Sequence, residues 1–385
     1  MSRLLRALAL AVFGMQIVLG ARVFIRMAGT AGGTRVKPAA GIRVGDRVTI
    51  IVPVLDERAR LASCLDGLLT QGAEVAEILV VDGGSTDGTP ALAASYATRD
   101  PRLHLLFSPP PSSGSNGKAH NLGYGIAQAD PQSTWVLTID ADVRPAPGLV
   151  AALVAHARQE DVDALSVATQ QRLSGAAEAL VHPSMLATLV YRFGIPGHAT
   201  NDPVAVQANG QCFLIRRDAL LDIGGFREVL DSVCEDVTLA RILATSGRRV
   251  GFYEADGLVE VAMYAGAGDA WRNWLRSLPM RDRFWGIPGW LGLAEVLLVQ
   301  AVPLPLTLAL VRQGGFPGFW GRFNLVLFAM RIGVLGGTSR AYQNRPWTYW
   351  LSPLCDLPVA LGVLLSAVRR THTWRGRAIT RGASR

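Results

Sequence analysis

Residues 77–89 read EILVVDGGSTDGT, and this one stretch contains a strand, a turn and the start of a helix. Glu77–Asp82 is an apolar, β-branched run that ends on a carboxylate, and two glycines follow it. Thr89 can cap a helix whose first residue is Pro90. A strand that leads through a polar turn into a helix is the repeating unit of α/β proteins, so the stretch predicts an α/β domain.

The same alternation continues on both sides of this stretch. Further strands are predicted at Val48–Val54 (VTIIVPV), Leu103–Phe107 and Trp135–Asp140 (WVLTID), and further helices at Glu57–Leu69 and Lys118–Ala129. Continuous apolar strands separated by helices predict a mainly parallel sheet with helices on both faces. Ligands of such sheets bind beyond the carboxyl ends of the strands.

Polar groups collect at that edge of the predicted sheet. They are Pro53–Glu57 (PVLDE), Asp82–Thr89 (DGGSTDGT), Gly117–Asn121 (GKAHN) and Asp140–Asp142 (DAD). Glycines let the backbone approach a ligand closely, and Lys118 offers a positive charge to phosphate. The two carboxylates of the last group can hold a divalent cation that also contacts phosphate, although such pairs also occur in capped turns. No GxGxxG or GxxxxGK[ST] motif occurs, which disfavours a dinucleotide site and a P-loop.

Six short motifs lie in a fixed order between about residues 48 and 283. They are VPVLDE, VDGGSTDGT, NGKAHNLG, TIDAD, NGQCFLIRRDAL with IGGF, and CED. In this order they resemble a family 2 inverting glycosyltransferase of the GT-A fold. The resemblance implies a nucleotide-diphospho-sugar donor, expected to be a UDP-sugar, and Mg²⁺ or Mn²⁺ as cofactor.

The resemblance also implies roles for single residues. The donor would be bound by Pro53, Asp56, Glu57, Asp82, Gly117, Lys118 and Asp140, and the metal by Asp142. Asp236 would be the catalytic base that takes the proton of the acceptor hydroxyl. Without the resemblance, Asp236 reads as a carboxylate favoured by the dipole at a helix start. Contacts to acceptor or diphosphate would come from Gly210, Gln211, Glu235, Arg272, Arg276, Trp374, Arg375 and Arg377.

One motif of membrane polysaccharide synthases is incomplete. Many of them carry Q-x-x-R-W after the acidic pair, and the Trp stacks on the growing chain. The nearest match here is residues 273–277 (NWLRS), which keep only the Arg, so transfer of a single sugar is expected. Arg272 and Arg276 share one face of a predicted helix, and one or both could bind diphosphate. The same helix also reads as an interfacial amphipathic segment with basic residues at its surface.

The chain has 385 residues, 50% of them hydrophobic and 18% charged, with a net charge of +8. Residues 1–45 and 369–385 together hold thirteen Arg and Lys and no acid, so the stretch between them carries a net charge of −5. A nucleic-acid binder concentrates positive charge on its folded domain, so nucleic acid is not expected as a partner. The four cysteines form no CxxC pair, which makes a zinc site or a disulfide framework improbable.

Long apolar runs at the ends predict a multi-pass protein of the cell membrane with a cytoplasmic catalytic domain. Ala7–Ala21 reads as an anchor or a signal peptide, and an uncleaved anchor is expected because nucleotide sugars are cytosolic. Trp290–Val311 and Trp350–Val368 can cross the membrane, whereas Phe319–Gly337 is interrupted by arginines and is suspected to be re-entrant or interfacial. A pair of buried core helices is the soluble alternative. The expected division is 1–46 (anchor and linker), 47–283 (GT-A domain) and 284–385 (membrane helices and basic tail).

A looser resemblance concerns the acceptor. Trp374, Arg375 and Arg377 are similar to the ending of lipid-directed members such as ceramide and carotenoid glucosyltransferases, although arginines here also fit a positive-inside tail. Residues 274–282 (WLRSLPMRD), 285–300 and 345–357 (RPWTYWLSPLCDL) look most like carotenoid glycosyltransferases. The expected reaction is therefore transfer of one sugar to a lipid hydroxyl, most simply of a carotenoid.

Other assignments are weighed against this one. Within the class, a ceramide, hopanoid or polyprenyl-phosphate acceptor and a polysaccharide synthase stay open. A sugar nucleotidyltransferase would carry a glycine- and arginine-rich first loop, which Pro53–Glu57 lacks. A degenerate membrane scaffold would have lost the carboxylates, which are all present here.

Overall fold

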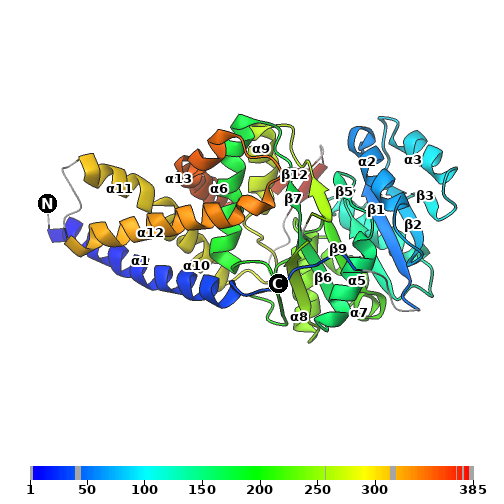
Figure 1. The fold of residues 1–385 in the computed structure, drawn as a ribbon, viewed down its shortest axis with the longest axis horizontal. Coiled ribbons are helices and arrows are strands. Elements are labelled where there is room, and N and C mark those ends of the chain that lie inside the picture. Colours follow the sequence, from blue (N-terminus) through cyan, green and yellow to red (C-terminus); the bar gives the residue numbers. More distant parts are fainter. Residues whose placement is uncertain are drawn as a thin grey trace.

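The computed structural model describes residues 3–39, 45–255, 257–312, 318–369, 371–374 and 377–380. Figure 1 shows an elongated molecule with apolar helices at one end and an α/β domain at the other. The GT-A fold expected from the motifs is the fold of this domain.

The main sheet has eight strands in the order β3-β2-β1-β4-β9-β6-β10-β8. The strands are β1 (Val48–Val54), β2 (Val75–Asp82), β3 (Leu103–Phe107), β4 (Trp135–Ile139), β6 (Ala164–Ala168), β8 (His198–Thr200), β9 (Cys212–Arg216) and β10 (Val250–Glu254). The first four strands of this order are parallel, as predicted. Strand β9 is antiparallel to both of its neighbours, β4 and β6, so the sheet is mixed, although most of its strand pairs are parallel.

The antiparallel direction of β9 affects which residues reach the site. Its first residue, Cys212, pairs with Ile139 at the end of β4. The chain therefore enters β9 at the edge where the parallel strands end, and the N–H of Asp140 donates to the carbonyl of Gln211 at 3.1 Å. An antiparallel strand thus brings the residues before it, Gly210 and Gln211, to the predicted ligand edge.

Helices cover both faces of the sheet (Figure 1). One face packs against α2 (Arg58–Leu69), α3 (Thr89–Ala97) and α5 (Leu149–Gln159), and the other against α4 (Gly117–Gln128), α7 (Arg217–Asp222) and α8 (Glu235–Thr245). Strand β1 contributes Ile50 and Val52 to the first core and Ile51 to the second, as the two-residue period of a strand requires. The predicted N-cap of α3, Thr89, is wrong by one residue. Gly88 is the cap, and Thr89 Oγ1 accepts from the N–H of Glu57 at 2.8 Å.

Four stretches are long and apolar enough to cross a membrane, by length and composition. They are Leu10–Thr30, Ile287–Arg312, Gly318–Ala341 and Trp347–Val368. The first stretch belongs to α1 (Arg3–Thr30), and the second consists of α10 (Ile287–Glu295), a π-helical turn (Val296–Ala301) and α11 (Pro303–Arg312). The third consists of α12 (Gly318–Gly337) and a 3₁₀ turn (Thr338–Ala341). The fourth consists of a 3₁₀ segment (Trp347–Cys355) and α13 (Asp356–Val368). Helix α6 (Ala176–Phe193) packs among them, although its sequence lies within the α/β part.

One of the two arginines that argued against a span in Phe319–Gly337, Arg331, is paired. Arg331 Nε lies 2.8 Å from Asp356 Oδ2, and both side chains are about 1% exposed. Ser184 and Gln300 donate to the other oxygen of Asp356 at 2.6 and 3.0 Å. Polar groups in apolar surroundings need such partners, and these bonds join α6, α12 and α13.

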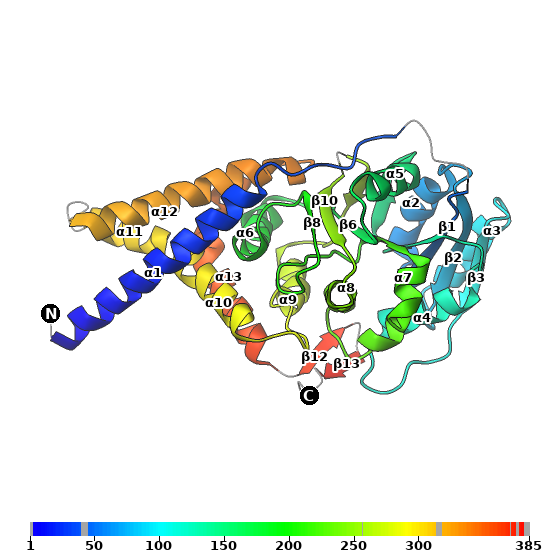
Figure 2. The ribbon, with the colours of Figure 1, turned by 90° about the horizontal axis from the view of Figure 1, so that it is seen from below.

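The remaining elements lie around the sheet edge and the tail. A small sheet has the order β5-β11-β7, formed by Val143–Pro145, Val259–Val261 and Gln170–Gln171. A 3₁₀ turn (Gly225–Val229) precedes α8, and α9 (Ala267–Ser277) packs against α6 and α13. Strands β12 (Thr371–Trp374) and β13 (Arg377–Thr380) form a hairpin near the C-terminus (Figure 2).

Candidate active site

A cavity of about 570 Å³ lies at the carboxyl ends of β1 and β4. Most residues predicted for the site line it, although they come from six separate parts of the sequence. They are Pro53, Glu57, Gly117, Lys118, Asp140, Asp142, Gly210, Gln211, Glu235, Asp236 and Arg276. The predicted sheet edge is therefore where these groups converge.

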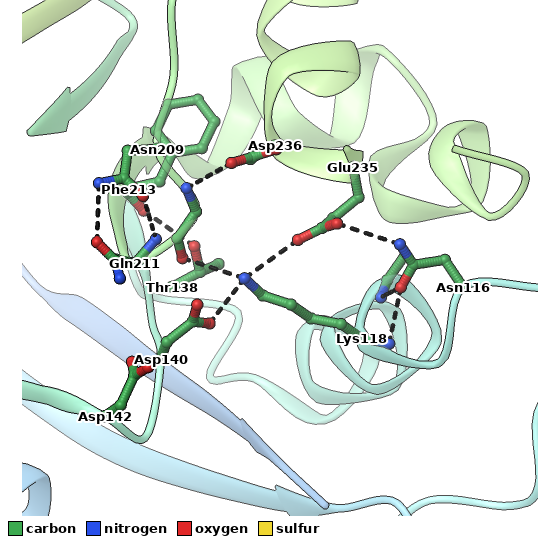
Figure 3. Close-up of polar contacts among 12 residues, drawn as sticks. Asn116, Lys118, Thr138, Asp140, Asp142, Asn209, Gln211, Phe213, Glu235 and Asp236 are labelled. Atoms are coloured by element: carbon green, nitrogen blue, oxygen red, sulfur yellow. Dashed lines mark hydrogen bonds and ion pairs between the residues drawn. The ribbon is translucent and has the colours of Figure 1, made fainter. Parts of the chain in front are cut away.

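Lys118 lies at the centre of the polar contacts in Figure 3. Its Nζ is 2.7 Å from Asp140 Oδ1 and 3.1 Å from Glu235 Oε1, and it donates to the carbonyl of Gly210 at 3.3 Å. Burial alone would lower the pKa of Lys118, but Asp140, Glu235 and Asp236 raise it above its usual value. The ammonium group is therefore charged at neutral pH and available to an anionic ligand.

Asn116 sets the position of Lys118. As the cap of α4, its side-chain oxygen accepts from the N–H groups of Lys118 and Ala119 at 2.9 and 3.1 Å. Its amide nitrogen donates to Glu235 Oε2 at 3.1 Å and to the carbonyl of Ser232 at 2.9 Å. One buried amide thus joins the start of α4 to the start of α8.

Asp236 is the second residue of α8 and is held by backbone donors. Its Oδ2 accepts from Gly210 N at 2.6 Å, and its Oδ1 accepts from Val237 N at 2.8 Å. Burial, with a further contribution from Glu235, raises the pKa of Asp236 to about 6. A Cβ on Gly210 would lie 2.8 Å from Lys118 Nζ and 3.1 Å from Asp236 Oδ2, so a larger residue there would displace these two side chains.

Asp142 has the properties expected of a cation ligand. Its Oδ1 is buried and has no hydrogen-bond partner among the described residues, and its Oδ2 lies 3.7 Å from Arg60 Nη1. Burial and the neighbouring Asp140 raise its pKa to about 7, which means that the charged form lacks compensation. No group of three or more metal-ligating side chains occurs within the described ranges. The site therefore fits a cation held by one or two carboxylates together with substrate oxygens.

The charge of the cavity wall also favours a bound cation. Six carboxylates line the cavity, against three basic side chains, Arg60, Lys118 and Arg276. A diphosphate is itself anionic, so a wall with excess negative charge would repel it at short range. A bound divalent cation would remove most of this mismatch.

Some predicted residues do not reach the cavity wall. Asp82 is buried and accepts from the N–H groups of its own turn, at Gly84 and Ser85. Asp56 is exposed beside the cavity, and its Oδ1 accepts from Thr86 N at 2.7 Å. Arg272 is exposed and does not line the cavity, whereas Arg276 does. Of the two arginines predicted to bind diphosphate, Arg276 is therefore the one that lies at the cavity.

The basic tail contains the last three residues predicted for the site. Arg375 lies outside the described residues, and Trp374 and Arg377 face each other in backbone register across the β12–β13 hairpin. Their proposed contacts with acceptor or diphosphate therefore stay predictions.

Sequence reasoning missed several residues of the wall. Arg60 pairs with Glu57 at 2.7 Å and faces Asp142, and its position one helical turn after Glu57 was a usable signal. Tyr264 and Asn273 line the cavity from the segment before α9 and from α9 itself. No local pattern marks these two, because only the packing of α9 brings them to the site.

Comparison with known proteins agrees with this geometry. The family model described as glycosyl transferase family 2 matches residues 49–224. The succinoglycan biosynthesis protein ExoA of Rhizobium meliloti is 28% identical over 218 residues, which cover 54% of this chain and 62% of ExoA. The glycosyltransferase GlyG of Streptococcus pneumoniae is 22% identical over 120 residues, 31% of this chain and 38% of GlyG. The chain thus spans less than two thirds of either relative.

A solved structure shares the fold. It is a mannosyltransferase from Pyrobaculum calidifontis in complex with GDP-Man and Mn²⁺, with a TM-score of 0.56 and 22% identity, covering 93% of this chain and 99% of that one. At this identity the likeness speaks for the fold alone. The family model matches residues 49–224, and the α/β domain has the GT-A fold that the six ordered motifs predicted.

Proposed function

We propose that the protein transfers one sugar from a nucleotide-diphospho-sugar to a hydroxyl of a membrane-borne lipid, with inversion at the anomeric carbon. The observation that carries this proposal is the juxtaposition of Lys118, the Asp140–Asp142 pair and Asp236 around one cavity, beside helices apolar enough for a membrane. We assign residues 47–283 to catalysis and the flanking segments, 1–46 and 284–385, to the membrane.

In this mechanism the donor diphosphate lies beside Lys118 and the Asp140–Asp142 pair. Asp142, with its unpartnered oxygen, would hold Mg²⁺ or Mn²⁺, with Asp140 beside it. The metal would neutralise charge that develops on the leaving diphosphate. Lys118 adds a fixed positive charge to the same region, and Asn116 holds it there. The Mn²⁺ in the mannosyltransferase structure supports this assignment.

Asp236 takes the proton of the acceptor hydroxyl. A hydroxyl is a weak nucleophile at neutral pH, so its proton must move to a base as it attacks. A carboxyl with a pKa of about 6 is ionised at pH 7 and still basic enough to accept this proton. A single displacement needs no covalent sugar–enzyme intermediate, and it inverts the anomeric centre.

The acceptor is proposed from position and from resemblance. The cavity wall includes α9, which packs against α6 and α13 at the apolar end of the molecule, so a lipid could reach the cavity from the bilayer. A carotenoid is the acceptor that residues 274–282 and 345–357 favour. Polysaccharide assembly is the second candidate, because the relatives include ExoA and the lipopolysaccharide core biosynthesis glycosyltransferase LpsC of Rhizobium meliloti, 34% identical over 90 residues.

The test is a product analysis. Membranes with the wild-type chain or with Asp236→Asn are incubated with UDP- and GDP-sugars and with hydroxylated carotenoids, and the lipid extract is analysed by mass spectrometry. One hexose or deoxyhexose on a carotenoid, present only with wild type, supports the first candidate. Single-sugar adducts on another lipid keep the reaction and change the acceptor. A ladder of sugars on one acceptor supports polysaccharide assembly, and absence of any adduct with every donor contradicts the proposed transfer.

A further inference from the structure

A second cavity, of about 260 Å³, lies where the apolar helices meet the α/β domain. It is bounded by the end of α1, the end of α6, the start of α10 and α8, and it shares no residue with the catalytic cavity. Both ribbon views show α1 beside α10 (Figures 1 and 2). Nothing in the proposed transfer reaction uses this cavity.

The wall of this cavity is strongly basic. Four arginines line it, Arg22, Arg26, Arg192 and Arg241, whereas Glu295 supplies its carboxylate. Glu295 is shared, because Arg22 lies 3.0 Å and Arg26 2.8 Å from its two oxygens. Arg241 pairs with Asp282 at 2.7 Å, behind the wall. Four positive charges thus face two negative ones.

Arg192 shows the excess most clearly. It is 7% exposed, it donates to the carbonyls of Leu278 and Pro279 at 2.5 and 2.8 Å, and no carboxylate of the described chain lies within 4.0 Å of it. Burial and then Arg241 lower its pKa to about 9. A buried charge without a counter-ion is costly, so an anion in the cavity would stabilise the arrangement.

Hydrogen-bond donors are also left over. Arg241 Nε and Trp285 Nε1 are buried, and neither has a partner among the described residues, although both residues line the cavity. An oxyanion accepts several such bonds at once, and bonds from charged donors are the stronger ones. The cavity therefore has the charge and the donors of a phosphate site.

The position of this cavity relative to the apolar stretches indicates where a bound phosphate would come from. Arg22 and Arg26 lie near the end of the apolar stretch Leu10–Thr30, and the exposed Trp290 lies near the start of Ile287–Arg312. Arginine and tryptophan at the ends of apolar helices mark the headgroup level of a bilayer. We propose that this cavity binds the headgroup phosphate of an anionic phospholipid.

A bound headgroup would also act on the catalytic cavity. Arg192 and Arg241 hold the segment 278–282, since Arg241 donates to the carbonyl of Met280 at 3.1 Å. This segment follows α9, whose Arg276 lines the catalytic cavity, and Arg241 belongs to α8, which begins at Glu235. Compensating the arginines would fix both helices, so anionic lipid should raise the rate of transfer. This consequence rests on the proposed function, whereas binding does not.

The test measures lipid binding to the full-length protein in detergent. Dioleoylphosphatidylglycerol or dioleoylphosphatidylcholine is titrated, and bound lipid is counted by native mass spectrometry while the unfolding temperature is recorded. Arg22→Gln removes one cavity charge, and Arg26 still pairs with Glu295, so the fold should persist. Arg283→Gln is the matched control, because Arg283 is similarly exposed (42% against 47%) and lies outside the cavity.

Wild type and Arg283→Gln should bind phosphatidylglycerol in preference to phosphatidylcholine, and Arg22→Gln about fivefold more weakly, the effect of about 1 kcal/mol for one arginine. Equal losses in both variants would mean general surface attraction and overturn the site. Equal binding of the two lipids by wild type would do the same. Protection by millimolar inorganic phosphate without protection by phosphatidylglycerol would show a free-anion site and overturn the lipid assignment. None of these readouts depends on sugar transfer, so they stand even if the proposed reaction fails.

Discussion

Asp236 is the residue whose two interpretations differ most in their consequences. As the base, it should lose about 10²- to 10⁴-fold in transfer rate on Asp236→Asn. As a carboxylate that only stabilises the start of α8, it should lose about 0.3–1 kcal/mol of stability and keep a near-normal rate. We expect the large loss of rate with donor binding almost unchanged, because Lys118 and the Asp140–Asp142 pair lie on the donor side.

The comparison needs nucleoside diphosphate titration and initial rates at equal amounts of folded protein. Asp231→Asn, on the exposed loop before α8, is the control and should behave like wild type. A rate within threefold of wild type for Asp236→Asn would remove Asp236 from the mechanism and make Glu235, which contacts Lys118, the next candidate.

The raised pKa of Asp236 predicts a pH limb. A base must be unprotonated, and its pKa is about 6, so kcat/KM should be constant above pH 7 and fall about tenfold per unit well below pH 6. Asp142, with a pKa of about 7 before metal binds, should make metal affinity fall over the same range. Rates are therefore measured at saturating Mn²⁺. A profile that is flat down to pH 5 would argue against a carboxylate base.

The unpartnered oxygen of Asp142 predicts metal dependence. Chelation with EDTA should abolish transfer, and Asp142→Asn should weaken Mn²⁺-dependent donor binding by at least tenfold, because one charged ligand is lost. Asp269→Asn is a matched control, since Asp269 lines the same cavity from α9. Calorimetric titration of Mn²⁺ with and without nucleoside diphosphate measures the effect. Full transfer after EDTA treatment would refute the metal assignment.

At the residue scale, the sequence predicted which charged residues belong to the site better than it predicted which side chains contact one another. The Asp140–Asp142 pair, Lys118 and Asp236 were found because each stands in a motif at the end of a strand or the start of a helix. Arg276 and Arg272 could not be separated, since which side of α9 meets the cavity depends on how α9 packs against α6 and α13. Asn116 was passed over although Asn before a helix is a familiar cap, because its second bond, to Glu235, is 119 residues away.

At the scale of elements, the start of α4 and the start of α8 are joined by Asn116, and the joint can be tested. Asn116→Ala removes the cap and should lower stability by about 1 kcal/mol. Asn116→Asp keeps an oxygen that can cap α4 but loses the donor to Glu235 and places a carboxylate beside it. We therefore expect Asn116→Asp to lose more activity than Asn116→Ala, although it keeps the oxygen that caps α4.

Thermal unfolding in detergent and initial rates of both variants give the comparison. Asn201→Ala, at an exposed asparagine outside the cavity, is the control. Parallel losses of stability and activity in the two Asn116 variants would mean that Asn116 acts only as a cap.

The predicted elements were accurate where local patterns decide them. The strand predicted at Val48–Val54 has these bounds in the structure, and the helix predicted at Glu57–Leu69 begins one residue later. The orientation of β9 was not predictable, because pairing with β4 and β6 depends on tertiary contacts and not on any period within CFLIR. The place of helix α6 among the apolar helices was likewise not predicted, because its sequence, which contains His182 and Pro183, lies inside the catalytic stretch.

At the scale of the whole molecule, the apolar stretches do not all have the same relation to the α/β domain. The start of α1, the end of α11 and the start of α12 lie at the end of the molecule far from that domain (Figure 1). Both ends of Trp347–Val368, in contrast, contact the catalytic stretch, since Thr348 donates to the carbonyl of Ala176 and Ser366 to that of Arg276. This stretch, rather than Phe319–Gly337, is the better candidate for a segment that does not cross.

The arrangement predicts three crossings. Leu10–Thr30, Ile287–Arg312 and Gly318–Ala341 each run between the far end and the α/β domain, so an odd number of spans places the N-terminus opposite the catalytic domain and the C-terminus beside it. Because nucleotide sugars are cytosolic, the domain side should be the cytoplasm. Reporter fusions after residues 46, 344 and 385 should be active only in the cytoplasm, and one inserted between residues 312 and 318 only outside. Four crossings would instead put the C-terminal reporter outside while the reporter after residue 344 stays in the cytoplasm. Outside activity of the reporter after residue 46 would reverse the whole orientation and remove the cytosolic donor from reach.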